Sequence, residues 1–167
     1  YVQWGAGFPD LDNDGRMDIV IVTGHVYPEV ESALPEYPHR SPRLVFRHAG
    51  EGRFEDVSAV SGSGATLPQS SRGAAFADLE NDGDVDVLVM NMNAPPSLLR
   101  NDNRGSGGSV RIELEGTRSN RQGIGATVLV TAGGRTQARA VLSQSSPHVG
   151  TSQPSCPSAW PTVTKCV

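Results

Sequence analysis

The sequence predicts an all-β fold made of two repeated units of short strands, followed by a smaller region rich in β-hairpins. Three observations support this prediction. An acidic nine-residue segment occurs twice, starting at Asp10 and again at Asp78. Each copy leads into a run dominated by β-branched residues, which is typical of a buried strand. The chain also has 19 Gly and 12 Pro and is only 5% aromatic, a balance that favours short strands joined by turns.

The two acidic segments are candidate calcium loops. Residues 10–18 read Asp-Leu-Asp-Asn-Asp-Gly-Arg-Met-Asp, and residues 78–86 read Asp-Leu-Glu-Asn-Asp-Gly-Asp-Val-Asp. Acidic side chains at loop positions 1, 3, 5 and 9 converge on one point if the backbone curls around it, and such a density of hard oxygen ligands suits Ca²⁺. The glycine at position 6 permits the sharp turn, and position 7 is expected to contribute its backbone carbonyl. The predicted metal ligands are therefore Asp10, Asp12, Asp14, Arg16 and Asp18 in the first loop, and Asp78, Glu80, Asp82, Asp84 and Asp86 in the second.

Neither segment fits an EF-hand, although both begin like one. An EF-hand needs a bidentate Glu at position 12 and a helix after it. That position holds Ile21 in the first copy and Val89 in the second, and both lie in strand-like runs. We therefore expect each loop to join two strands and to be closed by the Asp at the start of the second strand. A calcium ion surrounded by carboxylates and carbonyls has no open position for activating water, so its expected role is structural.

The elements around the loops repeat in the same order. The predicted strands of the first unit flank its loop within residues 1–24 and continue at 43–48 and 53–57; those of the second unit are 73–78, 85–91 and 97–101. Between them, residues 25–42 contain four prolines and are not expected to hold a regular element. Repeated four-stranded units of this size fit the blades of a β-propeller, so we predict a partial propeller of about two blades.

The composition changes after residue 104. Strands are predicted at 110–114, 126–131 and 136–142, the last two forming a hairpin around the Gly133-Gly134 turn. Residues 123–128 begin like a dinucleotide fingerprint but open a strand, where that motif requires a helix. Four arginines are candidates for an anion- or glycan-binding face, although scattered Arg on exposed strands is usually solvated surface: Arg118, Arg121, Arg135 and Arg139.

Two stretches of the chain resemble known families. The phrases at residues 7–15 and 74–83 resemble the FG-GAP or VCBS repeats of integrin-like β-propellers, and the similarity covers roughly residues 1–102. That resemblance implies calcium in the acidic loops; Glu80 departs from the Asp or Asn usual at its position. Residues 114–126 resemble the ASPIC/UnbV domain, with similarity to about Ser146.

The resemblances set the expected domains. They are FG-GAP/VCBS blades at 1–104, an incomplete ASPIC/UnbV-like β domain at 105–146, and a tail at 147–167 outside the similarity. The tail has no periodicity and contains both cysteines, Cys156 and Cys166, whose pairing the sequence leaves open. We hypothesise that a shift of the reading frame near Ser146 produced this tail.

Net charge and the absence of certain motifs limit the classes of function that fit the sequence. The net charge is -4, and nine of the 18 acidic residues lie in the two loops, so a cation is the implied partner and nucleic acid is disfavoured. No run is long and apolar enough for a membrane span, and no catalytic motif is present. The chain starts without Met, at Tyr1, so we expect a fragment whose targeting segment and remaining blades lie upstream.

Two functions fit these observations. The first is a non-enzymatic, calcium-binding module outside the cytoplasm, extracellular or periplasmic, that binds a protein or glycan in adhesion. The alternative is a non-catalytic accessory segment of a larger secreted enzyme. Calcium sites of weak to moderate affinity work where calcium is abundant, which favours a location outside the cytoplasm for either function.

Overall fold

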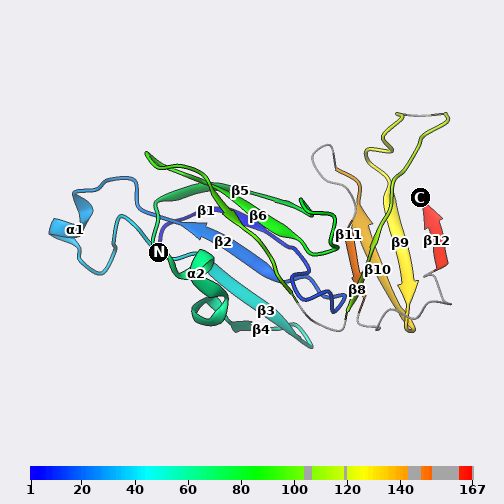
Figure 1. Cartoon of the computed structure of the whole chain (residues 1–167), viewed down its shortest axis with the longest axis horizontal. Coiled ribbons are helices and arrows are strands. Elements are labelled where there is room, and N and C mark those ends of the chain that lie inside the picture. The colour runs from blue at the N-terminus through cyan, green and yellow to red at the C-terminus, as the bar shows by residue number, and fades with distance from the viewer. Residues whose placement is uncertain (104–106, 119, 143–147, 152–161, 167) are drawn as a thin grey trace. The chain divides into compact units, whose positions relative to one another are not determined.

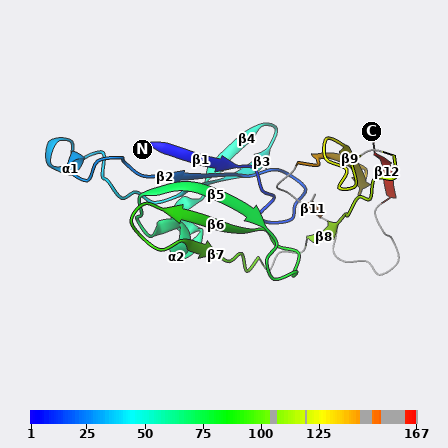
Figure 2. The same ribbon diagram turned by 90° about the horizontal axis from the view of Figure 1, so that it is seen from above.

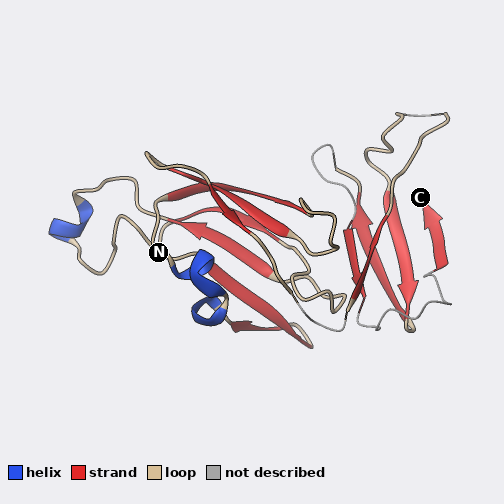
Figure 3. Ribbon diagram, viewed as in Figure 1, coloured by secondary structure: helices blue, strands red, loops and turns tan. Residues whose placement is uncertain are grey.

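The computed structural model describes residues 1–103, 107–118, 120–142, 148–151 and 162–166 (Figure 1). Antiparallel strands make up most of the regular secondary structure in these residues, and the helices are short (Figure 3). The predicted all-β class is therefore confirmed. By internal contacts the chain divides into two units: residues 1–9, 17–76 and 86–101 form the first, and residues 10–16, 77–85 and 102–167 form the second. None of the helices in the described ranges is long and apolar enough to cross a membrane.

The first unit contains two sheets that repeat one strand order. One sheet has the order β1-β2-β3-β4, with β1 Gln3–Gly7, β2 Ile19–Thr23, β3 Leu44–Gly50 and β4 Arg53–Asp56. The other has the order β5-β6-β7, with β5 Ser71–Ala77, β6 Asp86–Asn91 and β7 Ser97–Leu99. In each sheet, neighbours in sequence are also neighbours in space, as the internal repeat predicts. The acidic segments join β1 to β2 and β5 to β6.

Alternating valines form the core of both sheets. Val20 and Val22 of β2 are buried, as are Val87 and Val89 of β6, because successive side chains of a strand point to opposite faces. Small residues let β1 approach β5: a Cβ at Gly5 would lie 3.1 Å from the nitrogen of Ala74, and one at Gly7 would collide with the ring of Phe76. Figure 2 shows the two sheets lying beside one another. The repeated loops are thus carried by two closely packed sheets.

One expectation about the connections was wrong. A single helical turn, α1 Val30–Ala33, lies within the proline-rich connection 25–42, where no regular element was expected. It fits because its four residues fall between Pro28 and Pro35, so no proline interrupts its hydrogen bond from Leu34 N to Val30 O. The connection from β4 to β5 contains two further short helices, η1 Ser58–Val60 and α2 Gly62–Thr66.

The second unit contains the C-terminal strands. They are β8 Gly108–Arg111, β9 Thr127–Ala132, β10 Arg135–Ala140, β11 His148–Thr151 and β12 Thr162–Cys166, in sheets of order β10-β9-β12 and β11-β8. The predicted β9–β10 hairpin is confirmed, with positive φ at Gly133 and Gly134, as a tight hairpin turn requires. Val128, Val130 and Val141 are buried together. Strands β11 and β12 lie in the segment that the sequence left without a pattern, and Cys156 lies outside the described residues.

Candidate metal centre

The first acidic loop is a tight turn held by its own carboxylates. Asn13 has φ 55 and Gly15 has φ 84, values in the left-handed region that Asn and Gly adopt most readily. The two carboxylate oxygens of Asp10 accept hydrogen bonds from the backbone N–H groups of Asp14 (3.0 Å) and Gly15 (2.9 Å). Asp12 Oδ1 accepts a further bond from Asp14 N at 3.3 Å. The backbone therefore curls around its acidic side chains, as the sequence predicts.

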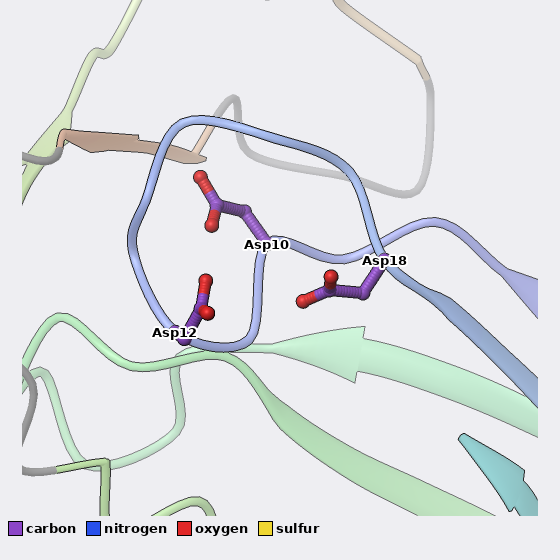
Figure 4. Close-up of side chains that lie close together, drawn as sticks. All are labelled: Asp10, Asp12 and Asp18. Atoms are coloured by element: carbon purple, nitrogen blue, oxygen red, sulfur yellow. The ribbon is translucent and has the colours of Figure 1, made fainter. Parts of the chain in front are cut away.

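Three carboxylates meet in this loop. One oxygen from each of Asp10, Asp12 and Asp18 lies within 4.8 Å of the other two, and Figure 4 shows the three side chains directed into the loop. Asp10 and Asp18 are only 3% and 2% exposed. Buried carboxylates repel one another unless a cation or hydrogen-bond donors compensate them. The cluster supplies the oxygen donors that a hard divalent cation requires.

Asp18 also fixes the loop to the sheet. Its backbone N–H donates to Pro9 O at 2.7 Å, which closes the base of the loop immediately before β2. Its Oδ1 accepts a hydrogen bond from the backbone N–H of His48 in β3 at 2.9 Å. Asp18 therefore links the base of the loop to Pro9 and to strand β3.

The carboxylate of Asp14 does not join those of Asp10, Asp12 and Asp18. Its Oδ2 forms an ion pair with Arg16 Nη1 at 2.7 Å, and its Oδ1 accepts from Arg16 N at 2.7 Å. Within the described residues, the carboxylate cluster consists of Asp10, Asp12 and Asp18, without Asp14. A cation that takes Asp14 as a ligand therefore has to compete with the Arg16 guanidinium.

The second loop repeats the turn of the first. The carboxylate of Asp78 accepts from the N–H groups of Asp82 and Gly83, both at 3.2 Å, and Asp82 Oδ1 accepts from Asp84 N at 3.1 Å. Asn81 and Gly83 have φ 57 and 94. The buried Asp86 accepts at Oδ1 from Asn101 N at 2.9 Å, as Asp18 accepts from His48. The two copies of the sequence repeat therefore form corresponding hydrogen bonds.

The two loops differ in how far their carboxylates gather. In the part of the chain that the structure describes, the side chains at Asp78, Glu80, Asp82 and Asp86 do not form a three-membered ligand cluster. Glu80 and Asp82 are exposed, and Glu80 carries the longer side chain that distinguishes this copy. The first loop is therefore the better formed of the two candidate centres.

An unpaired acceptor gives a further test of whether the first loop suits a cation. Asn13 is 3% exposed, and its Oδ1 is buried without a hydrogen-bond partner. An unsatisfied buried acceptor costs about 1 to 3 kcal/mol, and a cation or an ordered water next to it would lower that cost. This acceptor and the three gathered carboxylates belong to the same loop, whose oxygen donors are of the kind that a hard cation takes. Sequence reasoning assigned no role to Asn13, although the recurrence of Asn at position 4 in both copies is a signal for it.

Three of the four arginines proposed as a basic face have individual partners, including Arg135, whose Nη1 donates to Asp14 O at 3.2 Å. Arg121 pairs with Glu115 at 3.0 Å, and Arg139 donates to Gln137 Oε1 at 3.0 Å. Burial lowers the pKa of Arg139, an effect that the charge of Asp10 opposes. Arg118 and Arg135 are exposed. These contacts do not distinguish an anion-binding face from ordinary surface.

The fold and loops define an all-β repeat protein with aspartate-rich turns between the first two strands of each unit. A family model described as FG-GAP-like repeat matches residues 10–89, and a model described as ASPIC and UnbV matches residues 116–156. Residues 10–89 are therefore similar to FG-GAP-like repeats, and residues 116–156 are similar to ASPIC/UnbV domains. The second match extends beyond Ser146, the residue at which the similarity was expected to end.

A curated relative adds a local similarity. The chain is 37% identical over 57 residues to Cartilage acidic protein 1 of Xenopus tropicalis. This match covers 34% of the chain and 9% of the relative's length. FG-GAP and ASPIC/UnbV domains are generally non-catalytic, and FG-GAP repeats are typically extracellular and bind protein ligands.

Proposed function

We propose that the chain is a calcium-binding extracellular repeat module in which calcium closes the acidic loops and the β-sheets present a surface to a protein or glycan partner in adhesion. The observation that carries this proposal is the meeting of Asp10, Asp12 and Asp18, with ligand oxygens within 4.8 Å of one another. The shared hydrogen-bond pattern of the second loop supports a second, similar site. The calcium is structural, and the module itself is not an enzyme.

The residues proposed to hold calcium combine this cluster with the loop positions predicted from the sequence. In the first loop the carboxylates of Asp10, Asp12 and Asp18 form the core of the site, with Asp14 and the Arg16 carbonyl as further ligands. In the second loop the corresponding groups are Asp78, Glu80, Asp82, the Asp84 carbonyl and Asp86. A bound divalent cation would neutralise carboxylates whose repulsion otherwise opposes closure of the turn.

An aromatic surface supports the binding of a partner. Trp4 is 48% exposed and Tyr27 is 65% exposed. The Arg72 guanidinium lies 4.7 Å from the centre of the Trp4 ring, and it also donates to His25 O at 3.1 Å. Trp4 Nε1 donates to Gly24 O at 2.8 Å. Rigid, exposed Trp, Tyr and Arg side chains are enriched in protein interfaces, so this surface suits a protein partner.

Calcium titration of the full chain tests the proposal. We expect heat of binding by calorimetry and a higher melting temperature in calcium than in EDTA. Ligand that binds only the folded state stabilises it by about 2.7 kcal/mol at 100 times the dissociation constant, which is about 8 °C for a chain of this size. Magnesium should substitute poorly, because it resists cages made entirely of protein ligands.

Matched variants assign the sites. Asp12→Asn keeps an oxygen that accepts from Asp14 N but removes a charge, and it should abolish one bound ion; Asp82→Asn should abolish the other. Glu36→Gln removes an exposed acidic charge outside both loops and should change neither. Absence of calcium binding by the folded wild-type chain would refute the proposal, and so would equal effects of all three variants.

A further inference from the structure

The two acidic loops are joined by one side chain. Asn13 Nδ2 of the first loop donates to Asp84 Oδ1 of the second at 2.7 Å and to Gly83 O at 3.2 Å. Donor and acceptors are 71 and 70 residues apart in sequence. Asn13 is nearly fully buried, so water competes little for its amide.

Each end of this bridge lies inside a loop turn. Asn13 sits between Asp12 and Asp14, and its left-handed conformation is part of the turn that places the Asp10 carboxylate. Gly83 and Asp84 occupy positions 6 and 7 of the second loop, next to Asp82. A change in the closure of the first loop therefore moves a donor that holds the second loop in its turn.

We propose that Asn13 is a positioning residue that couples cation binding in the two loops, so that closure of the first loop around its cation raises the affinity of the second. This inference rests on the proposed function, in which both loops bind calcium. Asn13 binds the side chain of Asp84, whereas the role expected at position 7 belongs to the main-chain carbonyl of that residue. The second loop has fewer gathered carboxylates of its own, so it gains more from being held in its turn.

The expected coupling is about tenfold in the affinity of the second loop. Hydrogen bonds to charged groups contribute more than neutral ones, and a tenfold change in an equilibrium constant corresponds to the lower end of their range. The partial exposure of Asp84 keeps the estimate at this lower end. By thermodynamic linkage, occupation of the second loop raises the affinity of the first by the same factor.

Calcium titration of the ¹⁵N-labelled full chain, followed by NMR, separates the two loops. The amide resonances of Gly15 and Gly83 report the first and second loops individually. Asp12→Asn disables the first loop and should weaken calcium binding at Gly83 about tenfold. In a background of Asn13→Gly, the same Asp12→Asn change should have no further effect on Gly83, because the bridge is already absent.

Two variants and one control guard this test against a folding defect. Glycine and aspartate both tolerate the left-handed conformation at position 13, so Asn13→Gly removes the amide and Asn13→Asp replaces the donor by an acceptor. Both should uncouple the loops. Asn81→Gly makes the same change at the equivalent, exposed position of the second loop and should leave the coupling intact.

The outcomes separate this inference from the proposed function. Calcium binding in both loops, with coupling lost in Asn13→Gly and Asn13→Asp but kept in Asn81→Gly, supports the role of Asn13. Binding in both loops with unchanged coupling in the Asn13 variants overturns the inference and leaves the proposed function standing. Absence of calcium binding in the wild-type chain overturns both.

Discussion

Replacing Asp18 by asparagine should change stability in opposite directions with and without calcium. Asp18 is 2% exposed and belongs to the cluster of three carboxylates. Its Oδ1 also accepts from His48 N at 2.9 Å. Asparagine has the same size and keeps an oxygen for this hydrogen bond. The principal change is therefore the loss of one negative charge.

The magnitude without calcium follows from the distances in the cluster. Two unit charges at the 4.8 Å limit of the cluster repel by about 3.5 kcal/mol at an effective dielectric constant of 20, and by about 0.9 kcal/mol at that of water. Protonation of one aspartate at pH 7 costs about 4 kcal/mol and sets an upper bound on the repulsion that persists. We therefore expect Asp18→Asn to stabilise the calcium-free chain by about 1 to 3 kcal/mol. This gain corresponds to a melting temperature higher by about 3 to 9 °C.

Calcium should reverse the sign. The variant lacks one anionic ligand, so it loses much of the roughly 2.7 kcal/mol that calcium contributes at 100 times its dissociation constant. Thermal unfolding of wild type and variant, measured by circular dichroism in EDTA and in calcium, gives the four melting temperatures required. The variant should melt above the wild type in EDTA and gain less from calcium.

A matched control lies in the second loop. Asp86 is 2% exposed and accepts from Asn101 N at 2.9 Å, as Asp18 does from His48, but it belongs to no three-carboxylate cluster among the described residues. Asp86→Asn should therefore stabilise the calcium-free chain less than Asp18→Asn. If Asp18→Asn lowers the melting temperature equally in EDTA and in calcium, the carboxylate serves only the contact to His48 and the electrostatic reasoning is wrong.

Two further predictions concern the first unit. Arg43 is 1% exposed and donates to Gly64 O, Leu67 O, Asn91 Oδ1 and Ser97 Oγ; Arg43→Met should destabilise by about 3 kcal/mol or more because buried acceptors lose their donors, and an unchanged urea midpoint would contradict this. Hydrogen bonds from the Ser58 hydroxyl and N–H lower the pKa of the Asp56 carboxyl. The stability that Asp56 contributes is thus present above its unfolded-state pKa and lost as pH falls through the lowered folded-state pKa; Ser58→Ala should raise that pKa in an NMR titration, and an unmoved titration curve would refute the assignment.

Sequence alone determined the repeated elements and the turn chemistry of the loops. The valine alternation of β2 and β6 encodes strands, because the side-chain period of a strand is local. Gly15 and Gly83 mark sharp turns, because glycine populates positive φ readily. Asp18 and Asp86, at position 9, were expected to close the loops because the second strand begins there. These features depend on neighbours along the chain and need no knowledge of the fold.

The tertiary structure decided which of the predicted ligands meet. All four acidic positions of the first loop were equivalent in the sequence, yet Asp14 pairs with Arg16 while Asp10, Asp12 and Asp18 converge. Side-chain torsions and competing partners set this choice, and residue spacing does not encode them. The same applies to the second loop, where the sequence pattern is similar but the carboxylates form no cluster of three among the described residues.

The sequence also did not predict the contacts between the two repeated units. Arg43 was part of a predicted strand with no assigned role, since arginine is seldom fully buried, but packing of the two sheets encloses it with backbone and amide acceptors. Asn13 and Asp84 are 71 residues apart and meet because two closely packed sheets carry their loops side by side. Local patterns specify each loop by itself, whereas the packing of one sheet against the other determines what each loop touches.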